Sequence, residues 1–255
     1  MSEVVVTRGG SVATVIFNRP ERRNAMSLGL MRAFDAALAA LAADRAVAVV
    51  VIAGEGGQAF GAGLDIKEAS TLSPEQHAEQ HALYEGFQQR MIDFPKPLVA
   101  AVEGVAAGAS LQVVLHCDLV VVAEGARIGM PELSAGRPAI MGSYLLWSRL
   151  GPGVAARLIL GQDWLDAREA AACGLAAKAV AKGEALEAAF AYAARLATTA
   201  PNALAATLAW LRELRNGAGS GFADARARAD AILPDAAASD EARAADAHFA
   251  RGARG

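Results

Sequence analysis

Short runs of β-branched and other apolar residues recur through the first half of the chain, and turn-forming residues separate them. These runs predict strands at Val4–Thr7, Ser11–Asn18, Ala46–Gly54, Pro97–Gly104 and Asp118–Gly125. Apolar residues repeat with helical spacing from Ser27 to Ala43, and Ser27 is a suitable N-cap residue. Apolar strands that alternate with helices predict an α/β architecture.

Strand signals nearly vanish after about residue 140, and alanine-rich helical patterns prevail from there to Arg251. Caps or breakers bound four of the predicted helices: Gly151–Gly161, Asp166–Cys173, Glu184–Thr198 and Pro201–Arg215. The composition changes near residue 200. We therefore expect a core of residues 1–199 and a helical C-terminal region of residues 200–255, which either completes the core or forms a subunit interface.

The composition is that of a folded protein and narrows the classes of partner. Of the 255 residues, 54% are hydrophobic and 20% are charged, which is the opposite of a disordered chain. A net charge of -3 provides no overall attraction for nucleic acid or for an anionic membrane, so neither is expected as a partner. Polar residues interrupt the most apolar stretch and argue against a membrane span: Glu103, Gln112, His116 and Asp118.

The cysteines and histidines predict neither a disulfide framework nor a metal site. Cys117 and Cys173 are too few for a set of disulfides or a four-thiolate zinc site. His77 and His81 share a face of the helix expected after Pro74, but no third ligand accompanies them. Because the N-terminal residues also lack a secretory pattern, we expect a reduced, cytoplasmic protein without a bound metal.

A glycine-rich segment, AGEGGQAFGAGLDIKEA, follows the third strand run. Gly54, Gly56 and Ala59 fit a variant of the dinucleotide-binding fingerprint. That fingerprint requires a helix that opens on the glycines, whereas residues 60–65 are expected to continue as a loop. An NAD-dependent oxidoreductase therefore stays open as an alternative of another class.

Two clusters of small residues could bring backbone N–H groups close to a ligand. One is Gly61–Gly63, and the other is Ala106–Ser110, after which a helix is expected to begin. A helix N-terminus presents unpaired N–H groups and favours negative charge. Two such segments facing each other would form an oxyanion hole, and the alternative is that both are tightly packed turns.

Four segments occur in order over most of the chain: NRPERRNAMS (18–27), AFGAGLDIKE (59–68), KPLVAAVEGVAAGASLQVVLHCDLVVVAEGARIGMPEL (96–133) and ARLILGQDWLDAREAAACGL (156–175). In these segments the chain resembles the crotonase superfamily, the enoyl-CoA hydratase/isomerase family. The resemblance implies a crotonase-like spiral of ββα units with a helical C-terminal region used in trimerisation. It also implies a homotrimer or a hexamer of two trimers, an acyl-CoA substrate, and no cofactor, since coenzyme A is part of the substrate.

Carried over residue by residue, the resemblance places the two oxyanion-hole donors on the backbone N–H groups of Leu64 and Ala109. The family's hydratases carry two catalytic glutamates, which correspond here to Glu132 and Gln112. Glutamine cannot give or take a proton at neutral pH. The resemblance also implies a set of residues that bind the substrate and its CoA moiety: Arg22, Ala25, Ala62, Asp65, Ile66 and Lys67.

The missing carboxylate at Gln112 favours double-bond isomerisation with Glu132 as the single acid and base. Hydration with Gln112 orienting a water, and CoA-ester binding without turnover, remain alternatives. The resemblance further implies that residues 66–93 cover the acyl pocket, so His77, His81 or Tyr84 could touch substrate, although most of them are expected to face solvent.

Two further residues near the predicted site have simpler interpretations as well. Arg137 lies five residues after Glu132 and either lowers the pKa of that carboxyl or is a solvated loop residue. His116 follows Gln112 by one helical turn and is expected to pack in the core.

Overall fold

The computed structural model describes residues 2–215, which belong to two compact units. The first unit extends to Ala197 and contains both sheets, and the second begins at Thr198. Within the described residues the second unit contains α8 (Pro201–Arg215), at the bounds expected for a C-terminal helix. The remainder of the predicted C-terminal region, with the helical pattern up to Arg251, lies outside the described residues.

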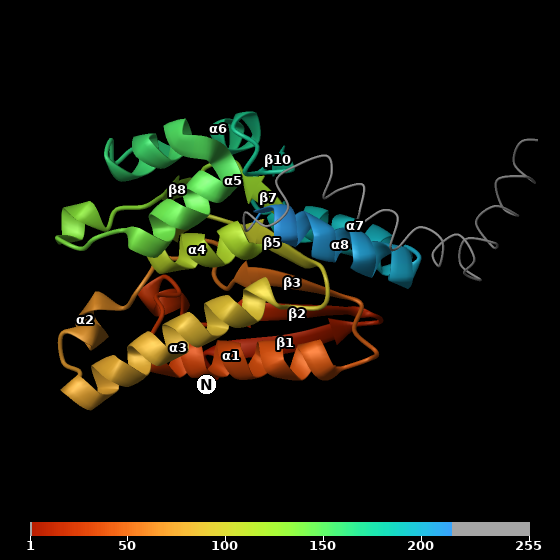
Figure 1. Ribbon diagram of the computed structural model, residues 1–255, viewed down its shortest axis with the longest axis horizontal. Coiled ribbons are helices and arrows are strands. Elements are labelled where there is room, and N and C mark those ends of the chain that lie inside the picture. Colours follow the sequence, from red (N-terminus) through yellow and green to blue (C-terminus); the bar gives the residue numbers. More distant parts are fainter. Residues whose placement is uncertain (1, 216–255) are drawn as a thin grey trace, which may run out of the picture. The chain divides into compact units, whose positions relative to one another are not determined.

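Ten strands of the described chain form two sheets (Figure 1). The larger sheet has six strands in the order β1 (Val4–Gly9), β2 (Val12–Phe17), β3 (Val49–Gly54), β5 (Leu98–Val102), β7 (Leu119–Ala123) and β10 (Lys178–Val180). Only the β1–β2 pair in this sheet is antiparallel. The smaller sheet has four strands in the order β4 (Ala59–Gly61), β6 (Val105–Ala107), β8 (Arg127–Gly129) and β9 (Trp164–Leu165).

The chain passes repeatedly from the large sheet to the small one. Of the successive pairs β3–β4, β5–β6 and β7–β8, the first strand joins the large sheet and the second joins the small sheet. Gly104 makes one of these turns with φ 62°, and a Cβ there would lie 2.0 Å from the carbonyl oxygen of Gln58, so only glycine fits. This winding of strand pairs confirms the predicted spiral of ββα units.

The described helices of the first unit are α1 (Leu28–Ala43), α2 (Ile66–Ala69), α3 (Pro74–Ile92), α4 (Gly108–His116), α5 (Ile140–Ile159), α6 (Ala167–Ala172) and α7 (Ala185–Ala197). Two 3₁₀ turns, Pro20–Arg22 and Leu133–Ala135, complete this set. Ser27 caps α1 as predicted, because its Oγ accepts from the N–H of Leu30 at 3.0 Å. A capping box formed by Ser73 and Gln76 starts α3.

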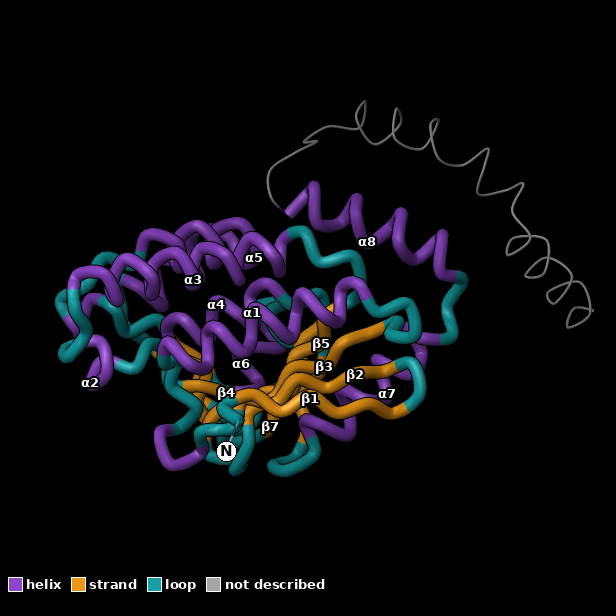
Figure 2. The backbone as a smooth tube through the Cα atoms, turned by 90° about the horizontal axis from the view of Figure 1, so that it is seen from below, coloured by secondary structure: helices purple, strands orange, loops and turns teal. Residues whose placement is uncertain are grey.

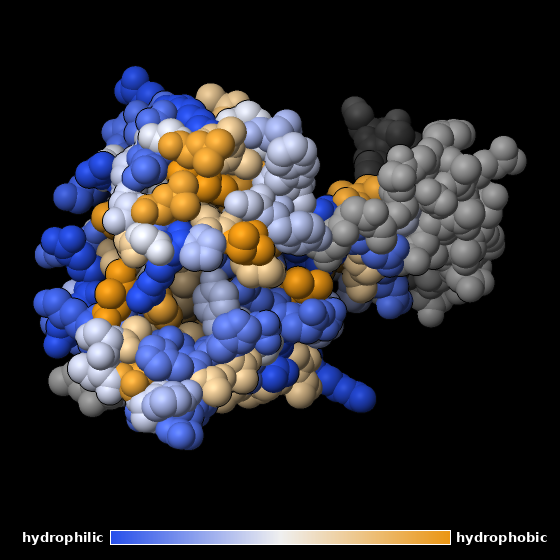
Figure 3. Space-filling model, turned by 60° about the vertical axis from the view of Figure 1, so that its left-hand side comes forward, coloured by the Kyte–Doolittle hydropathy of each residue, from blue (hydrophilic) through white to orange (hydrophobic). Residues whose placement is uncertain are grey.

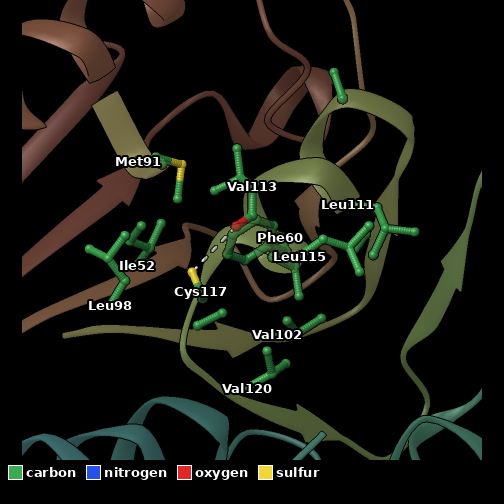
Figure 4. Packing of buried hydrophobic residues seen from close by; sticks show 14 of the residues in the cluster. Ile52, Phe60, Met91, Leu98, Val102, Leu111, Val113, Leu115, Cys117 and Val120 are labelled. Carbon is green, nitrogen blue, oxygen red and sulfur yellow. Dashed lines mark hydrogen bonds between the residues drawn. The ribbon is translucent and has the colours of Figure 1, made fainter. Parts of the chain in front are cut away.

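The four inner strands of the large sheet, β2, β3, β5 and β7, are buried on both faces. On β3, Val49 and Val51 pack toward α7, whereas Val50 and Ile52 belong to the core on the other face. Figure 2 shows α1, α3 and α4 together on that other face. Figure 4 shows part of this core, in which buried side chains of α4 lie beside those of β5 and β7.

Several short elements differ from the sequence-based expectations. The strands β4, β6, β8, β9 and β10 were not predicted, and each has only two or three residues, too few for a periodic pattern. Residues 59–61 therefore form a strand where a continuing loop was expected, and β9 and β10 lie in the part expected to lack strands. No helix within residues 2–215 is long and apolar enough to cross a membrane.

Candidate active site

A cavity of about 540 Å³ lies between the loop after β4, α3, the start of α4 and the segment that leads into α5. Its volume is in the range of sites for small molecules and cofactors. Figure 3 views the molecule from the side of α2 and the beginning of α3, where exposed apolar side chains gather among polar ones. The exposed Ile66, Ile140 and Met141 all line this cavity.

The loop after β4 brings Leu64 to the cavity. Leu64 forms a parallel bridge with Met26, in which Met26 N–H donates to Gly63 O at 2.8 Å and Asp65 N–H donates to Met26 O at 3.0 Å. In such a bridge the N–H of the middle residue points away from the partner strand. The N–H of Leu64 is therefore not used in the bridge to Met26.

The start of α4 lies directly against this loop. Gly63 has φ 87°, and a Cβ built on it would lie 3.1 Å from Ala107 O and 3.6 Å from Ala109 N. Ala109 is the second residue of α4, so its N–H has no acceptor within the helix. The hydroxyl of Ser110 accepts from Gly63 N–H at 3.1 Å and ties the loop to the helix. The amides of Leu64 and Ala109 therefore border the same part of the cavity.

Glu132 lies beside these two amides. A Cβ added to Gly108 would come within 3.4 Å of its Oε1, so the carboxylate lies over the first residue of α4. The residue is half-buried, and Oε2 is buried without a hydrogen-bond partner in the protein. Burial raises the pKa of Glu132 above its ordinary value, although a hydrogen bond from its own backbone N–H opposes this.

Gln112 also faces the cavity, and Tyr84 of α3 sets its orientation. The hydroxyl of Tyr84 donates to Gln112 Oε1, and His116 Nε2 lies 3.1 Å from Oε1 of the buried Gln88. Burial and the nearby charge of Glu132 raise the pKa of Tyr84, while hydrogen bonds with Gln112 and Gln88 lower it less. Since the amide oxygen of Gln112 is occupied by Tyr84, the amide nitrogen is the end left for the cavity. His116 is buried, as expected for a core histidine.

The residues expected to bind the substrate and its CoA moiety lie in different surroundings. Ala62 and Ile66 line the cavity, whereas the exposed Arg22 and Lys67 and the buried Ala25 do not. The sixth residue, Asp65, is buried and has its own role at the start of α2, described next.

Asp65 caps α2 and binds Arg19. Its carboxylate accepts from Glu68 N–H at 3.1 Å and from Arg19 Nη1 at 3.1 Å. Burial by itself raises the pKa of Asp65, but these hydrogen bonds, together with the charges of Arg19 and Arg22, lower it overall. The side chain of Asp65 therefore fixes the loop that carries Leu64.

Other candidate residues also have defined positions. His77, His81 and Tyr84 line the cavity from one face of α3; the two histidines are largely exposed, as expected. Arg137 lines the cavity too, but it is not among the groups that shift the pKa of Glu132, so the first of the two interpretations of Arg137 has no support. No group of three or more His, Cys, Asp or Glu residues within residues 2–215 is arranged to hold a metal ion.

The glycines of the dinucleotide-like segment do not open a helix. Gly54 ends β3, Gly56 and Gly57 turn with positive φ, and Ala59 begins β4. The fingerprint requires a helix N-terminus at this point to bind a pyrophosphate. The segment therefore lacks the structural basis of the NAD-dependent alternative.

Three residues of this site were not assigned a role from the sequence: Gln80, Gln88 and Ser110. Gln80 of α3 lines the cavity, and its Nε2 is buried without a partner. Their roles depend on contacts between α3, α4 and the β4 loop, which are far apart in the chain. The polar face of α3 at positions 77, 80, 81 and 84 is the one pattern that could have indicated Gln80.

The fold and the site define a class of α/β protein in which a half-buried carboxylate lies beside two backbone amides in a ligand-sized cavity. Residues 7–226 match the family model described as enoyl-CoA hydratase/isomerase. The chain is 37% identical to a probable enoyl-CoA hydratase of Rhizobium meliloti over 197 residues, which cover 76% of this chain and 75% of the relative.

Two further proteins extend the comparison. The chain is 34% identical over 216 residues to the 2,3-dehydroadipyl-CoA hydratase of Escherichia coli, covering 84% of this chain and 83% of that protein. The crystal structure of an enoyl-CoA hydratase from a Polaromonas species superposes with a TM-score of 0.89 at 28% identity, covering 98% of this chain and 97% of that one. The chain therefore belongs to the enoyl-CoA hydratase/isomerase family of the crotonase superfamily.

Proposed function

We propose that this protein moves a proton on an enoyl-CoA thioester, with Glu132 as the single acid and base, and that the reaction is double-bond isomerisation. This proposal rests on the side chains that line the cavity. Among the described residues that line it, only Glu132 has a carboxylate, and Gln112 occupies the position expected for a second. Because an amide does not exchange protons at neutral pH, Gln112 does not take part in proton transfer, and Glu132 is the carboxylate that makes both transfers in this proposal.

The isomerisation of a 3-enoyl-CoA needs one such residue. Ionised Glu132 removes a proton from the α carbon, and the electron pair of that bond forms a dienolate with its charge on the thioester oxygen. Protonated Glu132 then gives the proton to the γ carbon, the double bond moves to the α and β carbons, and the carboxylate is regenerated. No water, oxidant or reductant is consumed.

Two features of the site support this chemistry. The amides of Leu64 and Ala109 are available to donate to the dienolate oxygen, and one such donor is typically worth about 10²- to 10³-fold in rate. The raised pKa of Glu132 makes the carboxylate a stronger base and, once protonated, keeps the proton close to its acceptor.

Hydration of a 2-enoyl-CoA is the second candidate, and the names of the relatives favour it. The Rhizobium meliloti and Escherichia coli proteins are both called hydratases. In this reaction Glu132 accepts a proton from a water that attacks the β carbon and then returns it to the α carbon. The amide nitrogen of Gln112 is the group available to hold the water.

The test compares the wild type with Glu132→Gln and Gln112→Glu on 3-enoyl-CoA and 2-enoyl-CoA. We expect isomerisation by the wild type, a loss of about 10²- to 10⁴-fold in Glu132→Gln, and a gain of hydration in Gln112→Glu. Glu187→Gln is a matched control, since Glu187 is an exposed carboxylate on α7. Hydration faster than isomerisation in the wild type would establish the second candidate instead. Binding of CoA esters by calorimetry without either reaction would refute turnover.

An isotope label tests whether one residue carries the proton. With deuterium on the α carbon of 3-enoyl-CoA, a single carboxylate delivers part of the label to the γ carbon of the product. Mass spectrometry measures that fraction. Complete loss of the label to water would contradict a single carrier.

Cationic side chains near α2 support a proposal for the CoA moiety. Arg22 is close enough to Asp65 to act on its carboxyl, and the exposed Lys67 follows the cavity residue Ile66. Phosphates bind such side chains through charge-assisted hydrogen bonds. Replacing Arg22 and Lys67 by alanine should raise the KM for CoA thioesters with little change in kcat, and an unchanged KM would refute this role.

A further inference from the structure

The wall of the cavity formed by α3 is unusually polar for a site that holds an acyl chain. His77, Gln80, His81 and Tyr84 all line the cavity, at helical spacings of three and four residues. They form one polar face of the helix, while the segment before and at the start of α5 contributes apolar residues such as Ile140 and Met141. A purely alkyl chain would displace water from this polar face. It would offer the polar side chains no hydrogen bonds in exchange for those they make with water.

Gln80 is the residue of this face whose hydrogen bonding is incomplete within the protein. Its side chain is 8% exposed, and its Nε2 is buried with no hydrogen-bond partner in the protein. Buried amide donors in proteins are almost always paired with the protein or with ordered water, and this one has no partner in the protein. Because Gln80 lines the cavity, a hydrogen-bond acceptor on a ligand there is a candidate partner for its amide.

A second amide donor is held in a fixed orientation nearby. Gln80 lies one helical turn before Tyr84, whose hydroxyl donates to Gln112 Oε1. Gln88 also acts on the hydroxyl of Tyr84, whose pKa it lowers, and Oε1 of Gln88 lies 3.1 Å from His116 Nε2. Because the hydroxyl of Tyr84 already donates to the oxygen of Gln112, the amide nitrogen is the group left to donate to a ligand.

Both donors line the same cavity as the amides of Leu64 and Ala109. Gln112 follows Ala109 by three residues on α4, a rise of about 4.5 Å along the helix. With the thioester oxygen assigned to Ala109 and Leu64, the acyl chain is the part of the ligand that we assign to Gln112 and Gln80.

We propose that the cavity selects an acyl chain that carries an oxygen acceptor, a carboxylate, carbonyl or hydroxyl, which binds the side-chain amides of Gln80 and Gln112. This inference rests on the proposed function for the identity of the thioester, and it adds the chemical class of the acyl group. Gln80 is a specificity residue in this arrangement, and Tyr84 and Gln88 are positioning residues.

The experiment uses three 2-enoyl-CoA thioesters of six acyl carbons that end in a methyl, a hydroxyl or a carboxylate group, and the matching 3-enoyl-CoA set. For the wild type we expect kcat/KM for at least one oxygenated thioester to exceed that for the methyl-terminated one by at least about tenfold. In Gln80→Leu, which keeps the volume and removes the donor, this ratio should fall to about one. Gln89→Leu on the same helix is the matched control, because Gln89 is exposed and outside this cavity.

Binding of the corresponding saturated thioesters, followed by calorimetry, separates this inference from the proposed function. Turnover with equal kcat/KM for the three thioesters would overturn the inference and leave the function standing. Tighter binding of an oxygenated thioester without turnover would support the inference and refute the function. A ratio that Gln80→Leu does not change would overturn the role of Gln80, and a protein that neither binds nor turns over these thioesters would overturn both.

Discussion

The hydroxyl of Ser110 joins the two segments that carry the proposed oxyanion-hole amides, which makes Ser110→Ala a direct test of the site. Ser110 is fully buried on α4 and accepts the hydrogen bond of Gly63 N–H, the amide directly before Leu64. Removing the hydroxyl leaves this N–H without a partner in a place that water does not reach. The substitution introduces no new atoms, so its effects come from the lost acceptor.

The structure sets the expected size of the loss of stability and of the loss of activity. A buried donor left unpaired costs about 1–3 kcal/mol of stability. For a protein of this size that lowers Tm by about 2–12 °C. The loop after β4 also loses its hydrogen bond to α4. A shift of about 1 Å between two groups that act together in a reaction can reduce its rate by about 100-fold. We expect kcat to fall toward that limit while the fold persists.

Differential scanning calorimetry and steady-state kinetics on the same preparations measure the two effects. Ser70→Ala is the matched control, because Ser70 is exposed and its hydroxyl donates to Lys67 O at 2.9 Å. That variant should stay within about 0.5 kcal/mol of the wild type. A Ser110→Ala protein with the Tm and kcat of the wild type would refute the view that this hydroxyl holds the loop in place.

Three further substitutions test other parts of the argument. Burial raises the pKa of Glu132, so the ionised carboxylate destabilises the fold. The Tm of Glu132→Gln should therefore exceed that of the wild type by an amount that grows as pH rises through the raised pKa. A Tm difference that stays constant across pH would contradict this shift. The net lowering of the pKa of Asp65 gives stability that is present above about pH 4 and is lost as pH falls through the lowered value. Arg19→Ala should weaken that pH dependence, although Glu68 N–H still donates to the carboxylate, and should cost about 3–5 kcal/mol in urea unfolding at neutral pH; an unchanged midpoint would argue against the pair. Phe34 is fully buried with its ring 5.0 Å from that of Phe17, so Phe34→Ala should cost about 3–5 kcal/mol, and a loss below 1 kcal/mol would contradict its place in the core.

Local patterns were sufficient where neighbours in sequence decide the structure. Ser27 caps α1 because the acceptor and the N–H it needs lie three residues apart. The apolar run at β3 predicts a strand covered on both faces, and its residues do alternate between α7 and the opposite core. The motifs that contain Leu64, Ala109 and Glu132 likewise indicated the family from the sequence.

The two-residue and three-residue strands could not be predicted in this way. β4, β6 and β8 are held by pairing with one another, and the chain segments that pair lie tens of residues apart. A single short strand has no pattern of its own, so its conformation follows from its partners. This is also why residues 59–61, expected as loop, form part of a sheet.

The amino-acid sequence by itself determined the α/β class, the main strands and helices, the family, and the presence of a glutamine, Gln112, where the resemblance implies a carboxylate. Only the tertiary structure decided how the side chains around that residue act. It joined Tyr84 to Gln112, buried Gln80 without a partner, and surrounded Glu132 with enough protein to raise its pKa. Hydrogen bonding and desolvation depend on which groups come within a few ångströms of each other, and here those groups belong to α3, α4 and the loop after β8, which are distant in sequence.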